Sequence, residues 1–332
     1  MNSDADIQNA LDAVMLYRID AEKGEGKEIA KEYGVRAYPT FILANSEGKQ
    51  IDIWLGYSKS QFINTISQAT KDLSTIDEKQ ARFEIKPDLT SALTLARFHS
   101  AKEDYKEAVA YYMHAQTFAK EPSADFTYDI FDNAYDGMFK ELFTYDEASR
   151  AADAALVSKA NDPELKIWIA RRMATSASDR GHADDVARYL QSGLDLTSSS
   201  DGPDMKRTRA QLMVDFSLLV KHDTATAVEY KKTAMPESWT EDPNQLNEFA
   251  WWCFEHKVNL PEAERLSRKS IELAKPGREK ANNIDTLAEI LNARGKTQEA
   301  LEFSKKAATE DPSNKYFQEQ VARFEKELSS NQ

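Results

Sequence analysis

The stretch ANNIDTLAEILNARGKTQEALEFSKKAATEDP, residues 281–312, decides the fold of this chain. In its first half, apolar residues recur at the i, i+3, i+4 and i+7 spacing of one helix face, at Ile284, Leu287, Ala288 and Leu291. Gly295 favours the left-handed conformation that ends a helix. A second stripe follows at Ala300, Leu301, Ser304, Ala307 and Ala308, and Asp311-Pro312 stops it. The stretch therefore predicts a helical hairpin whose two helices pack closely.

Six residues stand where a tetratricopeptide repeat places its large, small, turn and breaking residues: Leu287, Ala288, Gly295, Ala300, Ala307 and Pro312. The hairpin therefore resembles that repeat. The resemblance implies an α-solenoid that binds a protein or peptide, and it does not identify the partner.

The hairpin recurs along the chain. Its most regular marker is a small residue early in each second helix, usually after an acidic residue. The markers are spaced by 36 to 41 residues: Glu107-Ala108, Glu147-Ala148, Asp185-Val186, Thr226-Ala227, Glu262-Ala263 and Glu299-Ala300. These intervals exceed the ~34 residues of the standard repeat and indicate divergent early repeats. We predict about six hairpins over residues 88–314.

Two further segments frame this array. A last apolar stripe at Phe317, Val321, Phe324 and Leu328 predicts a capping helix over residues 315–332, with a polar outer face. The polar run TSSSDGP, residues 197–203, predicts a mobile loop between two of the hairpins.

The first 72 residues follow a different rhythm. The apolar run VMLYRI at residues 14–19 predicts a strand, and residues 25–33 predict a helix that Gly34 caps. Residues 40–43 predict a second strand, and residues 45–48 are a turn by composition. In the third strand, Ile51, Ile53 and Leu55 alternate along the chain. Ser58 can cap a last helix that buries Phe62, Ile63 and Ile66. This order predicts an α/β or α+β unit.

A second resemblance rests on Asp20, the string YGVRAYPTF at residues 33–41, Glu47-Gly48-Lys49 and Gly56. Together they are similar to the C-terminal half of a thioredoxin. The resemblance implies a cis bond between Tyr38 and Pro39, and a loop of Ala37, Tyr38, Pro39 and Thr40 that contacts the backbone of a bound partner. The expected fold is a partial thioredoxin-like α/β module followed by an all-α solenoid of tetratricopeptide-like repeats.

Thioredoxin chemistry depends on a Cys-x-x-Cys pair, and this chain contains no such pair. By the resemblance, two strands are missing as well, and one of them is central to the sheet. One interpretation is a truncated thioredoxin whose redox segment, and any signal peptide, precede residue 1. A degenerate, non-redox relative is the other. The polar start MNSDADIQNA contains no signal peptide, so the compartment is cytoplasmic by default and periplasmic if a signal has been lost.

The bulk properties exclude some classes of function. The chain has 332 residues, of which 30% are charged, with a net charge of −13. This balance argues against general nucleic-acid binding, which needs a basic surface. No apolar run approaches the ~20 residues of a membrane helix. We expect two domains, with a linker over residues 73–87, because Pro87-Asp88 breaks the preceding polar segment.

Chemically active residues are few. The single cysteine, Cys253, lies on an apolar helix face, which favours an inert core residue over a reactive thiol. The histidines show no metal-ligand spacing: His99, His114, His182, His222 and His256. We therefore expect no cofactor, no metal and no catalytic residue in this chain.

The repeat resemblance places a peptide groove on the first helix of each hairpin. Glu248 and Trp252 would face it in the fifth hairpin, although packing between repeats also explains this tryptophan. In the last hairpin the same face would present Asn282, Asp285, Glu289 and Asn292. A set of basic residues for clamping a C-terminal carboxylate is not evident. The face is either a solvated acidic surface or a site for a basic or neutral peptide.

Three functions remain open at this point. The first is a protein-interaction scaffold derived from a thioredoxin-family protein. The second is a thiol-disulfide oxidoreductase whose catalytic segment lies upstream of the chain given. The third is a structural assembly module. Upstream sequence that encodes a Cys-x-x-Cys would favour the second.

Overall fold

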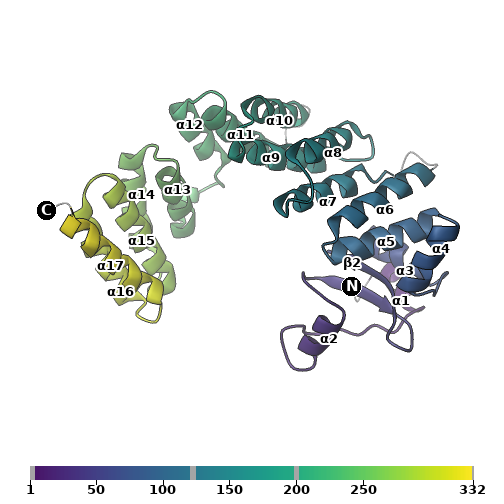
Figure 1. The fold of residues 1–332 in the computed structure, drawn as a ribbon. Coiled ribbons are helices and arrows are strands. Elements are labelled where there is room, and N and C mark those ends of the chain that lie inside the picture. Colours follow the sequence, from purple (N-terminus) through teal and green to yellow (C-terminus); the bar gives the residue numbers. More distant parts are fainter. Residues whose placement is uncertain (1–3, 120–124, 198–201, 331–332) are drawn as a thin grey trace. The chain divides into compact units, whose positions relative to one another are not determined.

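The computed structural model describes residues 4–119, 125–197 and 202–330 (Figure 1). Within these residues the chain forms 17 α-helices, one short 3₁₀ helix and a single two-stranded sheet. It divides into two compact units, Met1–Ile169 and Ala170–Gln332, and the division falls inside helix α9 (Pro163–Asp179). The fold is a helical array of sequential antiparallel pairs with a small N-terminal β-hairpin.

The N-terminal module follows most of the predicted order. It contains α1 (Ala5–Leu11), α2 (Gly26–Glu32), β1 (Thr40–Ala44), β2 (Gln50–Leu55) and α3 (Lys59–Ala69). The two strands are antiparallel, and the Gly48 N–H donates to the Asn45 carbonyl at 3.0 Å in the turn between them. Gly34 has a φ of +64° after α2, as its predicted role as a helix cap requires. A cluster of Ile7, Trp54, Phe62 and Ile66 packs α1 and α3 against the sheet.

Three details of this module were predicted wrongly. Residues 14–19 were predicted to form a strand, but Val14 lies in a bend, residues 15–19 have no regular secondary structure, and β1 pairs with β2 alone in the described part of the chain. Leu55 does not face inward, since it is 38% exposed, while Asp52 is buried where the alternating pattern expects a solvent-facing residue. Asp52 is buried because α5 covers the second face of β2, and Leu55 is the last residue of the strand. Ser58 precedes α3, but its hydroxyl lies 3.1 Å from that of Ser60 and does not cap the helix.

The expected linker at residues 73–87 instead contains a packed helix, α4 (Ile76–Ile85). A capping box between Thr75 and Glu78 begins it, and Ile76 and Phe83 are buried. Lys79 is also buried, and its ammonium group donates to the carbonyls of Ile51 and Asp72 at 3.2 Å each. These contacts hold α4 against β2, so the segment is an integral part of the first unit.

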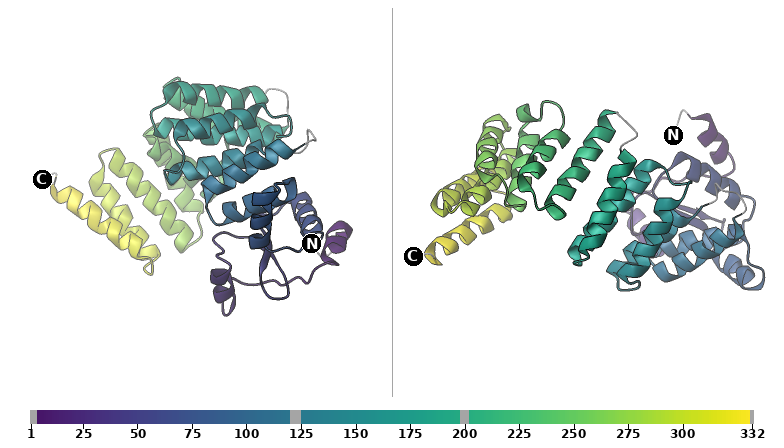
Figure 2. Two further views of the ribbon diagram at one scale, coloured as in Figure 1. Left: turned by 45° about the vertical axis from the view of Figure 1, so that its right-hand side comes forward. Right: turned by 90° about the horizontal axis from the view of Figure 1, so that it is seen from above.

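Beyond α4 the chain forms six helix pairs. The first helix of each pair is α5 (Leu89–Ala101), α7 (Thr127–Phe139), α9, α11 (Pro203–Leu219), α13 (Pro243–Glu255) or α15 (Arg278–Ala293). The second is α6 (Tyr105–Phe118), α8 (Tyr145–Val157), α10 (Ala183–Thr197), α12 (Thr224–Ala234), α14 (Leu260–Leu273) or α16 (Thr297–Glu310). Every marker residue predicted from the sequence is buried early in a second helix: Ala108, Ala148, Val186, Ala227, Ala263 and Ala300. Within the second unit, Figure 2 shows helices α13 to α17 side by side from two further directions.

The last hairpin is confirmed in detail. All nine residues of its two predicted stripes are buried, and Gly295 has a φ of +78° at the turn. The capping helix is α17 (Lys315–Ser330), which buries Phe317 and Phe324 against the hairpin. The predicted loop at residues 197–203 lies between α10 and α11, and residues 198–201 of it are outside the described residues. No helix in the described ranges has both the length and the apolar character needed to span a membrane.

Candidate binding surfaces

The face of α13 carries the two residues predicted for the fifth hairpin. Asp242 accepts hydrogen bonds from the N–H groups of Asn244 and Gln245, which fixes the start of the helix. The opposite face buries Leu246, Phe249, Ala250 and Cys253. Glu248 and Trp252 are one helical turn apart, so they share a face.

The environments of these two residues differ. The Trp252 ring is half-buried and lies between Phe249, at 6.2 Å, and His256, at 4.9 Å between ring centroids. The Glu248 side chain is 54% exposed, and it accepts a hydrogen bond of 2.9 Å from the nearly buried Lys231 of α12. Glu248 therefore neutralises a buried cation and also presents a carboxylate beside a partly open aromatic ring.

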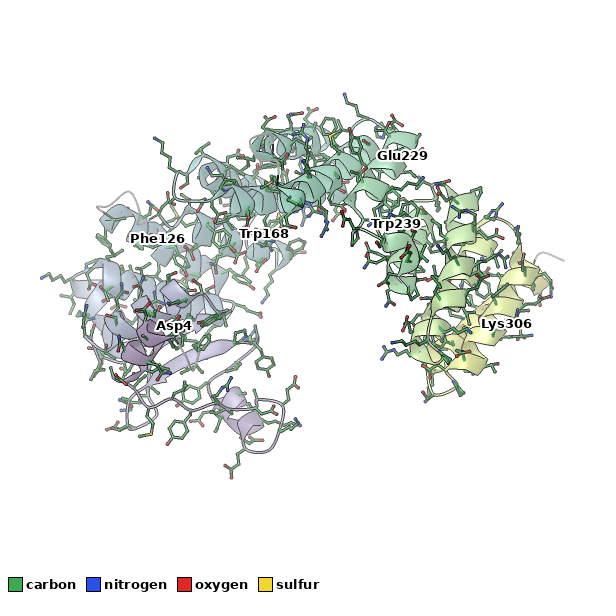
Figure 3. All side chains as sticks on the ribbon, turned by 180° about the vertical axis from the view of Figure 1, so that it is seen from behind. Asp4, Phe126, Trp168, Glu229, Trp239 and Lys306 are labelled. Atoms are coloured by element: carbon green, nitrogen blue, oxygen red, sulfur yellow. The ribbon has the colours of Figure 1, made fainter. Side chains whose placement is uncertain are left out.

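Two more tryptophans lie on α13 or pack against it. Trp251 is half-buried and packs on Phe254, with the ring centroids 5.0 Å apart. Trp239, in the 3₁₀ helix Trp239–Glu241, packs on Phe249 at 4.9 Å beside α13 (Figure 3). Neither Trp251 nor Trp252 is fully buried.

The groove residues predicted in the last hairpin do not form an open surface. Asp285 is buried, and the Tyr316 hydroxyl donates to its carboxylate at 3.1 Å. Glu289 forms an ion pair with Arg323, and the Asn292 side chain donates to Glu327 at 2.8 Å. All three partners belong to α17, so the capping helix occupies the face that the sequence assigned to a peptide. Only Asn282 of this set is exposed.

Burial changes the pKa of Asp285. Burial raises the pKa of its carboxyl to about 6, the nearby Glu289 adds to that rise, and the hydrogen bond from Tyr316 opposes it. One carboxylate oxygen also has no hydrogen-bond partner in the described residues. The buried position therefore favours the protonated form of the Asp285 carboxyl.

A second carboxyl with a raised pKa lies on α7. Burial, and then repulsion from Asp132, raise the pKa of Asp129 to about 7, and Arg97 acts in the opposite direction. Its charge therefore changes close to neutral pH. A perturbed carboxyl is a common feature of active sites, but structural clusters produce it too. Here the charged groups that act on it are the ion-paired Arg97 and the acidic Asp132 and Asp125.

The loop that resembles a thioredoxin partner-binding loop is exposed. The Tyr38-Pro39 bond is cis, as the resemblance implies, and Tyr38 is 61% exposed. The Thr40 hydroxyl donates to the Ala37 carbonyl at 2.6 Å, and the Gly56 N–H donates to the Pro39 carbonyl at 2.9 Å. Both contacts hold the loop at the end of the β-hairpin, with the Tyr38 ring directed to solvent.

The sequence analysis missed how much apolar surface the N-terminal module exposes. Seven large hydrophobic side chains over residues 15–57 are at least 38% exposed: Met15, Leu16, Tyr17, Ile19, Tyr38, Leu55 and Tyr57. The run at residues 14–19 has the local pattern of a buried strand, so the sequence gives no sign that it is exposed. Exposed apolar surface of this kind is typical of protein interaction sites.

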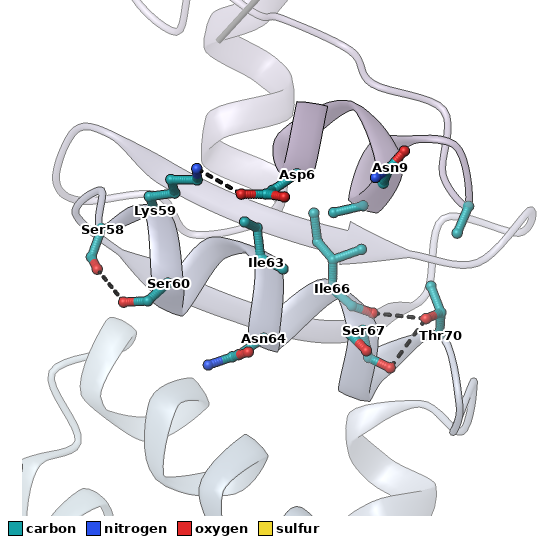
Figure 4. A pocket seen from close by; sticks show the side chains of 12 residues that line it. Asp6, Asn9, Ser58, Lys59, Ser60, Ile63, Asn64, Ile66, Ser67 and Thr70 are labelled. Atoms are coloured by element: carbon teal, nitrogen blue, oxygen red, sulfur yellow. Dashed lines mark hydrogen bonds and ion pairs between the residues drawn. The ribbon is translucent and has the colours of Figure 1, made fainter. Parts of the chain in front are cut away.

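An open groove of about 860 Å³ lies between α1 and α3 (Figure 4). Ala10, Ala13, Ile63 and Ile66 form its apolar part. Its rim is polar, and there the Lys59 ammonium group lies 2.9 Å from the Asp6 carboxylate. This pairing already satisfies the rim charges, so the groove offers a shallow contact surface rather than a reactive site.

No protein-family model matches this chain, and no curated protein matches it.

Cys253 is the only thiol, and it is buried against the core of the fifth hairpin. Burial raises its pKa to about 12, so the reactive thiolate is scarce at neutral pH. Within the described residues, no three His, Cys, Asp or Glu side chains come together in a way that could hold a metal ion.

Proposed function

We propose that this chain is a protein-interaction scaffold, in which a partial thioredoxin-like module is joined to tetratricopeptide-like repeats. The element order from α2 through β1 and β2 to α3 supports the first assignment. Six helix pairs with a buried small residue early in each second helix support the second. The partner is a protein or peptide.

One observation carries the proposal. Trp252 presents a partly open ring on an ordered helix, one turn from the half-exposed carboxylate of Glu248. An aromatic anchor beside a charge is the usual composition of an energetically important contact in a protein interface. The carboxylate and the net charge of −13 favour a partner that is basic or neutral.

A peptide-library selection tests this function. Peptides selected on the full chain are measured by fluorescence anisotropy against Trp252→Ala, with Trp251→Ala as the matched control on the same helix. We expect Trp252→Ala to weaken binding by about 2 kcal/mol, or roughly thirtyfold, while Trp251→Ala leaves it nearly unchanged. Circular dichroism checks that both variants fold. Equal affinity for the wild-type chain and the Trp252→Ala chain would contradict the proposal.

A second candidate is a thiol-disulfide oxidoreductase whose Cys-x-x-Cys lies outside residues 1–332. The exposed loop of Ala37, Tyr38, Pro39 and Thr40 favours it, since the resemblance assigns this loop to partner contact. The reading frame upstream of residue 1 discriminates the two candidates. A Cys-x-x-Cys encoded there, followed by insulin reduction by the extended protein, would support the enzyme; an upstream sequence without cysteines would remove it.

A further inference from the structure

A second groove, of about 490 Å³, lies in the second unit among α14, α15 and α16. Its apolar floor is formed by Ile271, Ile284 and Phe303, one residue from each helix. Ile284 is 4% exposed and the other two are half-buried, so apolar surface remains open there. All the lining residues belong to the stretch 202–330, which the structure describes without a gap. The volume falls within the range of ligand pockets in proteins.

Three lysines line the same groove, together with one acidic residue. Lys280 lies on α15, and Lys305 and Lys306 lie on α16. The acidic residue, Glu310, accepts a hydrogen bond of 2.8 Å from the Gly277 N–H. The groove therefore carries a local excess of positive charge, although the net charge of the chain is −13.

The three ammonium groups of this basic groove differ in their present contacts. Lys305 lies 2.9 Å from the Glu325 carboxylate of α17, and both side chains are more than half exposed. An exposed ion pair contributes little, so exchanging it for another anion costs little. Lys306 (Figure 3) lies over the Phe303 ring, 4.2 Å from its centroid, which holds this ammonium group at the apolar floor. Lys280 makes no ion pair in the described residues.

The combination of floor and charge indicates the chemistry of the occupant. An apolar floor beside cations fits a partner that presents an apolar side chain next to carboxylates. Three lysines are matched in charge by several carboxylates, whereas a fatty acid supplies one. A floor of three side chains also covers one apolar side chain and not a long acyl chain. Both features favour an acidic peptide over a lipid.

We propose that the basic groove binds an acidic peptide segment, with one aromatic side chain on the floor and carboxylates paired with Lys280, Lys305 and Lys306. This surface is separate from the α13 face, which favours a basic or neutral partner, and the proposal does not depend on that face. A chain with both surfaces would hold two segments of opposite charge.

The test uses the full chain and a fluorescein-labelled peptide, Glu-Asp-Glu-Phe-Asp-Glu, blocked at both ends. We expect saturable binding by fluorescence anisotropy, with a dissociation constant on the order of tens of micromolar. A second peptide has serine in place of phenylalanine, which keeps every carboxylate and removes the apolar contact. We expect this peptide to bind about tenfold more weakly.

Charge reversal in the protein locates the contact. Lys280→Glu should weaken binding of the acidic peptide about tenfold, whereas Lys280→Arg keeps the charge and should retain most of the affinity. Lys326→Glu is the matched control, because Lys326 is an exposed cation of α17 that does not line the groove. It should leave the affinity nearly unchanged. Trp252→Ala should also leave this binding intact, so failure of this proposal and failure of the proposed function are distinguishable.

Several results would overturn the proposal. No saturable binding of the acidic peptide is one, and equal affinity of the wild-type and Lys280→Glu chains is another. Equal affinity for the phenylalanine and serine peptides would show general charge attraction instead. Displacement of the peptide by an equal or lower concentration of decanoate would assign the groove to a fatty acid. A dimer in sedimentation experiments that Lys280→Glu dissociates would make a second copy of the chain the occupant.

Discussion

Arg97 on α5 holds the carboxylate of Asp52 on β2 at two points. Its Nη2 lies 2.6 Å from Oδ2, and its Nε lies 3.2 Å from Oδ1. The two side chains are only 11% and 2% exposed, and the Thr94 hydroxyl lies 3.4 Å from the same carboxylate. Since the pair spans 45 positions of the chain, it ties the N-terminal hairpin to the first helix of the array.

Removing one partner of this ion pair should be costly. Arg97→Ala leaves the Asp52 carboxylate buried without a counter-charge, and we expect a loss of about 3–5 kcal/mol in the free energy of unfolding. Urea denaturation followed by circular dichroism measures it, and hydrogen exchange in β2 locates the effect. Lys23→Ala, which removes an exposed ion pair with Asp20, is the control and should not shift the midpoint. Equal midpoints for Arg97→Ala and wild type would contradict a stabilising role.

The contact between α15 and α17 should weaken as the pH rises. The folded-state pKa of Asp285, about 6, lies above its ordinary value, so its contribution is complete below about pH 4 and is lost as the pH rises through 6. We expect a decrease on the order of 2 kcal/mol in unfolding free energy between pH 4 and 7. Asp285→Asn should abolish this component, measured as the difference from wild type at each pH. An unchanged pH profile in the variant would exclude Asp285 as its source.

The packing of α17 against the last hairpin should depend on the ring of Phe324. Phe324 is fully buried between α17 and the last hairpin, where it contacts Leu291 and its neighbours in one cluster. Phe324→Ala should lower the free energy of unfolding by about 3–5 kcal/mol because it opens a cavity. Lys326→Ala, two positions away on the exposed side of α17, should have little effect. The comparison is made by thermal unfolding, and similar midpoints for the two variants would count against this packing.

Cys253 should be chemically silent in the folded chain. Because burial raises its pKa to about 12, we expect no reaction with a disulfide reagent at pH 8 and complete reaction in denaturant. The same chain should not accelerate insulin reduction, since a dithiol is required. Rapid labelling of the native protein, or turnover that Cys253→Ser abolishes, would contradict the buried position.

The helical hairpins could be predicted because their determinants are local. Stripes such as Ile284, Leu287 and Leu291 repeat at the period of the helix, and Gly295 supplies the turn between two stripes. Each pair buries its own small residues, so the neighbours needed to form it are close in sequence. The same reasoning located the β-hairpin, whose turn and alternating residues lie within 20 positions of one another.

The binding residues depended on contacts that no local pattern contains. Asp285, Glu289 and Asn292 have the polar pattern of an open groove, yet each is bound by a residue of α17 more than 30 positions later. Asp52 has the pattern of a solvent-facing residue, yet it is buried because α5 covers that face of β2. Whether a helix face is open depends on what packs over it, and that is a property of the assembled chain.

The segment at residues 14–19 shows most clearly the difference between what a local pattern predicts and what distant contacts decide. Its apolar residues favour an extended backbone, because β-branched and aromatic side chains prefer that conformation. Whether it becomes a strand depends on a neighbour that supplies backbone hydrogen bonds, and β1 pairs with β2 alone in the described structure. The sequence by itself determined the helical pairs and the apolar character of this segment. Only the tertiary structure decided which polar faces are covered and which backbone edges remain open, since both depend on partners distant in the chain.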